Sequence, residues 1–102
     1  MEVSIPYKHI KFIDIDWQHR ICIHLADKNL YPSISYEKIW SELQNDPRFI
    51  ECYHRIIVNM DFIKYMNGED FILNDETLIP ISQRKSRDSK GKYMRHLLNS
   101  CL

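Results

Sequence analysis

Side chains that donate hydrogen bonds or carry positive charge gather at three separated places in the chain. They are Gln18-His19, Tyr53-His54-Arg55 and Ser82-Gln83-Arg84-Lys85. Arginine reads guanine edges in the major groove of DNA, asparagine, glutamine and histidine reach purine edges, and lysine and arginine bind phosphates. The three places together suit nucleic-acid binding. Each one taken alone is more typical of an ordinary solvated loop.

The middle group lies between two apolar runs, Phe49-Ile50 and Ile56-Ile57-Val58. The second run is β-branched, which favours a buried strand. Burying an unpaired arginine is very costly, so Tyr53-His54-Arg55 cannot all point inward. We therefore expect this group at a sheet edge or in an inter-strand loop, with its side chains directed outward.

Catalytic and metal-binding patterns are absent from the sequence. It contains no glycine-rich phosphate loop, no G-x-S-x-G elbow and no H-E-x-x-H helix. His19 and His24 lie five residues apart on an expected strand, hence on opposite faces, and cannot share a metal. Cys52 falls in the apolar phase of its strand, and no third group orients it with His54 as a nucleophile pair. The sequence thus predicts no enzyme, no cofactor and no metal.

The net charge of zero divides unevenly along the chain. Residues 82–102 carry six Lys/Arg and one acid, a balance of +5, whereas residues 1–81 carry eight Lys/Arg and thirteen acids, a balance of −5. A basic segment on an acidic domain favours an anionic partner at that end. The alternative is a solvated basic helix without a ligand.

Length and composition predict one small cytoplasmic domain spanning residues 1–102. The chain of 102 residues is 44% hydrophobic with only two glycines and four prolines, which allows one modest core. Apolar runs are too short for a membrane helix, and the N-terminus lacks a secretory signal. The odd, widely spaced cysteines are typical of reduced thiols, two buried and one near the tail, at Cys22, Cys52 and Cys101.

Periodicity predicts mostly short antiparallel strands with one central helix. Ser35 is a suitable N-cap for a helix that ends before Pro47, with an apolar stripe at Tyr36, Ile39, Trp40 and Leu43. The expected strands cover residues 10–15, 20–25, 30–31, 49–59 in two parts, 61–66, 71–73 and 77–81.

Turn and cap residues refine this prediction. Asn67-Gly68 is a strong hairpin signal, and Pro80 places the last strand at an edge or ends it there. Ser82 is expected to cap a terminal helix, whose first half Gly91 weakens. The apolar positions of that helix are Tyr93, Met94, Leu97 and Leu98.

Two segments carry a family resemblance. Residues 48–63, with Arg48-Phe49-Ile50 and Ile56-Ile57-Val58-Asn59, followed by Ile79-Pro80-Ile81-Ser82-Gln83-Arg84, resemble the LytTR family of bacterial DNA-binding domains. That family typically shows R-F-x-R-x-H-R-S-x-I-V-N-x-x-x-I and then I-P-V-S-R-R. Residues 10–14 and 20–25 resemble its D-I-x-Y-I-E and V-x-I-H-L strands, and residues 35–39 its S-L-K-E-L helix. The match runs from about residue 5 to residue 87 in family order.

The resemblance implies a fold and a set of contacts. It implies an elongated, all-antiparallel β fold of roughly ten strands with one short helix, whose inter-strand loops, rather than a recognition helix, enter successive major grooves. Carried over by motif, the base-reading residues are His19, His54 and Arg84, and the phosphate contacts are Arg20, Arg55, Lys85 and Arg87. The implied partners are promoter direct repeats in double-stranded DNA, bound by a dimer or by paired monomers.

The sequence departs from the family in three ways. Tyr53 and Arg55 replace the His and Ser of H-R-S, and Gln83 replaces the first Arg of S-R-R. The chain also begins late, as either an excised C-terminal domain or a short natural version. Family members usually follow a receiver domain or membrane helices, so the signal would come from missing sequence or from another protein. A protein-interaction module that lost DNA binding is the rival interpretation, and a His/Cys metal sensor is a third.

Overall fold

The computed structural model describes residues 5–101 of the chain as eight strands and two helices. Three 3₁₀ turns lie at Tyr7–His9, Met60–Phe62 and Gln83–Lys85. In chain order the larger elements are β1 (Ile10–Ile15), β2 (Ile21–Leu25), β3 (Asn29–Leu30), α1 (Tyr36–Leu43), β4 (Phe49–Tyr53), β5 (Ile56–Asn59), β6 (Ile63–Met66), β7 (Asp70–Leu73), β8 (Leu78–Pro80) and α2 (Ser86–Cys101).

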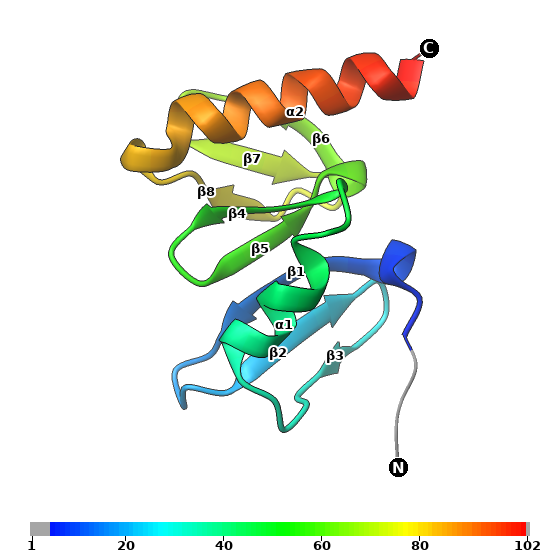
Figure 1. Ribbon diagram of the computed structural model, residues 1–102, viewed down its shortest axis with the longest axis vertical. Coiled ribbons are helices and arrows are strands. Elements are labelled where there is room, and N and C mark those ends of the chain that lie inside the picture. Colours follow the sequence, from blue (N-terminus) through cyan, green and yellow to red (C-terminus); the bar gives the residue numbers. More distant parts are fainter. Residues whose placement is uncertain (1–4, 102) are drawn as a thin grey trace.

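Two antiparallel sheets and two helices build the domain (Figure 1). The first sheet has strand order β3-β2-β1-β5-β4 and the second β6-β7-β8. The molecule is moderately elongated, with extents of 38 × 29 × 25 Å. The eight strands are fewer than the roughly ten that the family resemblance implies. Residues 61 and 62, expected at the start of a strand, belong to a 3₁₀ turn instead, in which the Asn59 side chain accepts a hydrogen bond from the Asp61 N–H at 2.9 Å.

The hydrophobic core lies in two parts, one on each face of the first sheet. One part joins that sheet to the second sheet and to α2, through residues such as Val58, Phe71 and Tyr93. The other joins it to α1, through residues such as Ile57 and Ile39. Neighbouring residues of a strand point to opposite faces, so Ile57 and Val58 enter different cores and both are fully buried. This explains why the Ile56-Ile57-Val58 run is continuously apolar.

The first helix follows its sequence signals. The Ser35 side chain accepts a hydrogen bond from the Lys38 N–H at 3.2 Å, as an N-cap should, and Tyr36, Ile39 and Leu43 are buried. The Trp40 side chain is only partly buried, at the margin of the core.

The second helix forms as expected but begins differently. It begins at Ser86 after a 3₁₀ turn, and the Ser82 side chain makes no capping hydrogen bond. It also continues through Gly91 without interruption. Only Tyr93 of the expected apolar positions is buried, against Phe71 at 5.4 Å between ring centroids. Met94, Leu97 and Leu98 are exposed, because the core packs against only one side of the helix.

The structure confirms the predictions made from Pro80 and from Asn67-Gly68. Pro80 ends β8, which is an edge strand. The hairpin at Asn67-Gly68 forms, but Gly68 has no positive φ, so the turn is not of the mirror-image type that this dipeptide favours. The Asn67 side chain closes it instead, accepting from the N–H groups of Glu69 and Asp70 at 2.8 and 2.7 Å. Within residues 5–101 no helix is long and apolar enough to cross a membrane.

Candidate nucleic-acid interface

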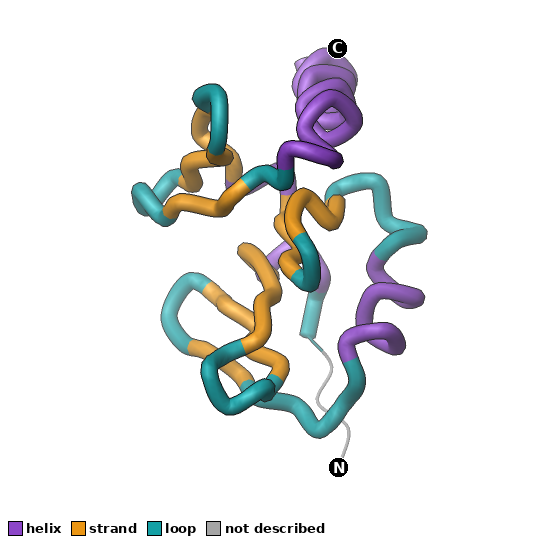
Figure 2. Tube along the Cα trace, turned by 90° about the vertical axis from the view of Figure 1, so that its left-hand side faces the viewer, coloured by secondary structure: helices purple, strands orange, loops and turns teal. Residues whose placement is uncertain are grey.

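The three segments singled out in the sequence lie on one side of the molecule. The β1–β2 loop, the β4–β5 loop and the start of α2 follow one another along the long axis on the left of Figure 1. Turned by 90°, the same side faces the viewer in Figure 2, with the three segments again stacked along the vertical axis. Segments that are far apart in the chain thus form one continuous edge.

The first segment is a tight loop closed by Asp16. Its carboxylate accepts from the N–H groups of Gln18 and Arg20 at 2.9 and 2.8 Å. His19 takes up the left-handed conformation, with φ of 64°, and is exposed. Backbone N–H groups and the Arg20 side chain hold the pKa of Asp16 below its ordinary value, the Arg20 N–H contributing most.

Arg20 is held on this loop by two further contacts. Its guanidinium pairs with the Asp16 carboxylate at 2.9 Å and lies over the Tyr31 ring, 4.5 Å from the centroid. Stacking and pairing of this kind orient an arginine fork. The remaining N–H groups of the guanidinium stay available at the surface.

The second segment is the two-residue connection His54-Arg55 between β4 and β5. Tyr53 pairs with Ile56 across the strands, which leaves only these two residues in the loop. Arg55 has φ of 57°, again in the left-handed region that few side chains tolerate. Its guanidinium lies 3.4 Å from the Glu37 carboxylate, and His54 is exposed.

The third segment is the 3₁₀ turn Gln83–Lys85 with the first turn of α2. Its backbone is fixed to the first sheet, because the Ser82 N–H donates to the Cys52 carbonyl at 2.8 Å. Arg84 and Arg87 are exposed and form no ion pair with any residue in the described part of the chain. Lys85 differs from both, since its ammonium donates to the Glu51 carboxylate.

Glu51 is the centre of a partly buried polar link. It accepts from Lys85 and also from the Tyr36 hydroxyl. Partial burial acts to raise the pKa of Glu51, but the two donors outweigh it and hold that pKa below its ordinary value. Burial, together with the same carboxylate, raises the pKa of Tyr36 far above its ordinary value, so Tyr36 stays a hydrogen-bond donor.

Two shallow depressions connect the first two segments. One, of about 430 Å³, is lined by His19, Arg20 and Arg55 together with residues 31–37. The other, of about 360 Å³, is lined by His54 and Arg55 with residues of α1. Arg84, Lys85 and Arg87 line neither depression. The third segment is connected to the first sheet through the Lys85–Glu51 pair.

The sequence analysis missed the acids that accompany these cations. Arg20, Arg55 and Lys85 each face a carboxylate, on Asp16, Glu37 and Glu51 respectively. Only Asp16, four residues from Arg20, gave a local signal in the sequence. The edge is therefore less positive than its count of basic residues indicates. The rejected Cys52–His54 pair is absent here too, since the Cys52 thiol is buried against the Pro80 carbonyl and His54 is exposed.

Comparison with solved structures identifies this architecture. One match is described as the LytTr DNA-binding domain of a "putative methyl-accepting/DNA response regulator" from Bacillus cereus. The chain has the LytTR fold. The two structures agree with a TM-score of 0.70 over 90% of this chain and 86% of the other, at 16% sequence identity. The sequence matches no family model, and a search of curated proteins gives no match. The two chains therefore share the LytTR fold at low sequence identity.

Proposed function

We propose that this chain binds double-stranded DNA sequence-specifically and regulates transcription, as a binding domain without catalytic activity. The observation that carries the proposal is the alignment of three polar loops along one edge of a LytTR fold (Figure 2). The solved relative with this fold is described as a DNA-binding domain. Loops spaced along one edge suit successive major grooves on one side of a duplex.

The exposed loop residues divide into two roles. His19, His54 and Arg84 read base edges, because each is exposed on a different loop and none of them forms an ion pair within residues 5–101. The phosphate contacts are Arg20, Arg55, Lys85 and Arg87. Of these Arg87 is free to approach a phosphate directly, whereas the other three must share their donors with a carboxylate.

A larger assembly belongs to the same proposal. Two copies occupy a pair of direct repeats in a promoter, as a dimer on DNA or as paired monomers. A receiver domain or a separate signalling protein in the cytoplasm supplies the regulatory signal. Size-exclusion chromatography with light scattering, with and without a two-repeat duplex, measures the stoichiometry.

A second function has one observation in its favour. Three of the basic residues on the edge are already paired with acids, which lowers the positive field that would attract DNA. On this interpretation the edge binds a protein partner through the same loops. The two functions differ in whether duplex DNA binds at low salt.

Mobility-shift titration with duplexes selected from a random library separates these functions. We expect binding at low salt that weakens steeply as salt rises, because phosphate contacts release counterions. Arg84→Ala should cost roughly 1–3 kcal/mol on the selected site and relax the preference at one base position. Arg87→Ala should weaken selected and random duplexes alike and reduce the salt slope by about one.

Lys28→Ala is the matched control for both substitutions. Lys28 is exposed in the turn between β2 and β3, at the opposite end of β2 from the His19 loop. Its removal should leave the affinity and the salt slope unchanged. An Arg84→Ala variant that lost equal affinity for selected and random duplexes would disprove the base-reading role. If no duplex binds at low salt, the protein-interaction function stands instead.

A further inference from the structure

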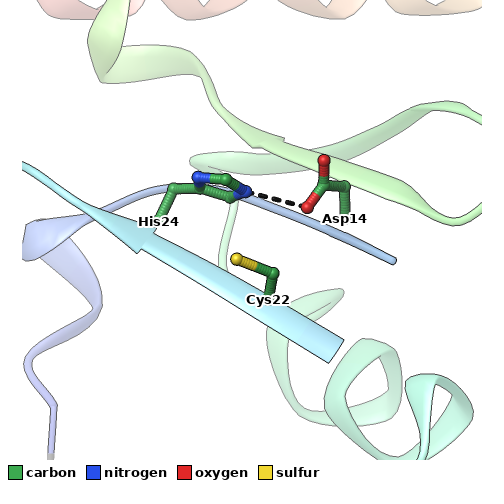
Figure 3. A group of neighbouring side chains, drawn as sticks. All are labelled: Asp14, Cys22 and His24. Atoms are coloured by element: carbon green, nitrogen blue, oxygen red, sulfur yellow. Dashed lines mark hydrogen bonds and ion pairs between the residues drawn. The ribbon is translucent and has the colours of Figure 1, made fainter. Parts of the chain in front are cut away.

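Asp14, Cys22 and His24 form a cluster on the hairpin of β1 and β2 (Figure 3). Asp14 and Cys22 are direct partners across the two antiparallel strands, and His24 lies two residues beyond Cys22 on the same face. The carboxylate oxygen, thiol sulfur and imidazole nitrogen all lie within 4.8 Å of one another. The cluster does not follow a linear sequence motif, because the pairing of β1 with β2 brings Asp14 next to Cys22 and His24.

The three donors are those that bind transition metals. Zn²⁺ accepts thiolate, imidazole and carboxylate ligands at roughly 2.0–2.3 Å, which puts tetrahedral donors roughly 3.3–3.8 Å apart. The donor atoms all lie within 4.8 Å of one another, and the His24 and Asp14 atoms are 2.8 Å apart, so the separations in the cluster are of this order. A single carboxylate is far too few oxygen ligands for Ca²⁺ or Mg²⁺. The donor set therefore selects a borderline or soft cation.

The surroundings orient the imidazole and leave an entrance. The His24 ring stacks on Phe12, with 3.8 Å between centroids and 11° between planes. Its Nε2 atom lies 2.8 Å from the Asp14 carboxylate, so both groups already point toward a common position. Their side chains are 21% and 34% exposed, while Cys22 is buried beneath them. An ion can enter from solvent past His24 and Asp14, and keep water as its fourth ligand.

We propose that Asp14, Cys22 and His24 bind one Zn²⁺ ion, or a transition metal of similar softness, with water completing a tetrahedral site. The ion binds Nε2 of the neutral His24 imidazole, whose one proton then lies on Nδ1, and the Cys22 thiol releases its proton to solvent on binding. Because the ligands lie on two paired strands, the bound ion cross-links β1 to β2. The proposal is independent of whether the chain binds DNA.

Titration of the purified full chain with Co²⁺ and then Zn²⁺ tests the site. Co²⁺ bound through Cys22 should give a sulfur-to-metal charge-transfer band with the d–d absorption of a tetrahedral site, at one equivalent. Zn²⁺ should displace it stoichiometrically and raise the Tm. Removing an outer-shell partner of a metal typically costs about 10–100-fold in affinity, so Asp14→Asn, His24→Gln and Cys22→Ser should each cost at least about 100-fold.

A matched control keeps the test decisive. His54→Gln removes an exposed imidazole that lies outside the cluster, and should leave Co²⁺ binding unchanged. Circular dichroism checks that each variant folds. Because Asp14 and His24 are partly exposed, their variants test the site without a substitution at the buried Cys22. The proposal is overturned if no charge-transfer band appears. It is equally overturned if folded His24→Gln and Asp14→Asn proteins bind Co²⁺ as the unaltered chain does, since the metal would then lie elsewhere.

Discussion

Lys85 forms an ion pair with Glu51, which lies 34 residues earlier in the chain on strand β4. The pair fastens the third polar segment to the first sheet. Glu51 also accepts from Tyr36 of α1, so one carboxylate connects three separate elements. Lys85 therefore positions the edge in addition to its proposed contact with phosphate.

Glu51→Gln should lower the free energy of unfolding at pH 7 by about 1 kcal/mol, since it removes a charged acceptor from two donors. The pKa of Glu51 is lowered in the folded protein, so its stabilisation is present above the ordinary glutamate value and is lost as pH falls through the lowered value. Urea unfolding from pH 7 to pH 3 should show the difference between the two proteins shrinking with acidity. Glu42→Gln, at an exposed position of α1, is the control and should change little. A difference independent of pH would contradict the charge-based explanation.

The elements of the fold were largely predictable, and their long-range contacts were not. The alternating residues 20–25 and the Ser35 cap are local signals, and both elements formed as predicted. The partners of Arg55 and Lys85 lie 18 and 34 residues away, beyond any local pattern. The spacing of Met94 and Leu97 predicts an apolar face but cannot tell whether another element covers it.

Arg55→Asn should leave the free energy of unfolding unchanged or raise it by up to about 1 kcal/mol. Arg55 has φ of 57°, a conformation that costs most side chains roughly 1–2 kcal/mol and that asparagine tolerates better. The exposed pair with Glu37 that is lost contributes little to stability. The same change should weaken all duplexes and reduce the salt slope by about one, if Arg55 contacts phosphate.

Urea unfolding and the salt dependence of duplex binding give separate measurements on the Arg55→Asn protein. Arg55→Lys is the companion variant, because it keeps the charge and the backbone strain. Lower stability in Arg55→Asn would show that the Glu37 pair outweighs the strain. An unchanged salt slope would remove Arg55 from the phosphate contacts.

Gly91→Ala should raise the free energy of unfolding by about 0.5–1 kcal/mol, because glycine in a helix interior is destabilising by that amount. A Cβ atom at this position would meet the Arg95 guanidinium at 3.5 Å, an ordinary contact with a flexible side chain. Thermal unfolding followed by far-UV circular dichroism, which reports helical content, provides the measurement. The same substitution in an Arg95→Ala background should give an equal gain. A loss in stability that Arg95→Ala restores would show that the contact is too close.

Asn59→Ala should cost roughly 1–3 kcal/mol in unfolding free energy, since Asn59 is fully buried and satisfies two backbone groups. Its amide donates to the Ile10 carbonyl at 2.9 Å and its oxygen accepts from the Asp61 N–H at 2.9 Å. Denaturant titration measures the cost. Asn29→Ala, at an exposed position of β3, should change stability by less than about 0.5 kcal/mol. Equal losses in the free energy of unfolding for Asn59→Ala and Asn29→Ala would show that the Asn59 hydrogen bonds do not stabilise the fold.

The placement of Ile57 and Val58 in two different cores has a kinetic consequence. Their strand, β5, pairs with β1 on one side and β4 on the other, so no local fraying frees their backbone amides. We therefore expect hydrogen exchange at these amides to require opening of the whole domain, so that its rate reports global stability. The two-residue loop that carries Arg55 ends where β5 starts. Its conformation is therefore set when the chain folds, and a partner that binds there meets a loop that is already ordered.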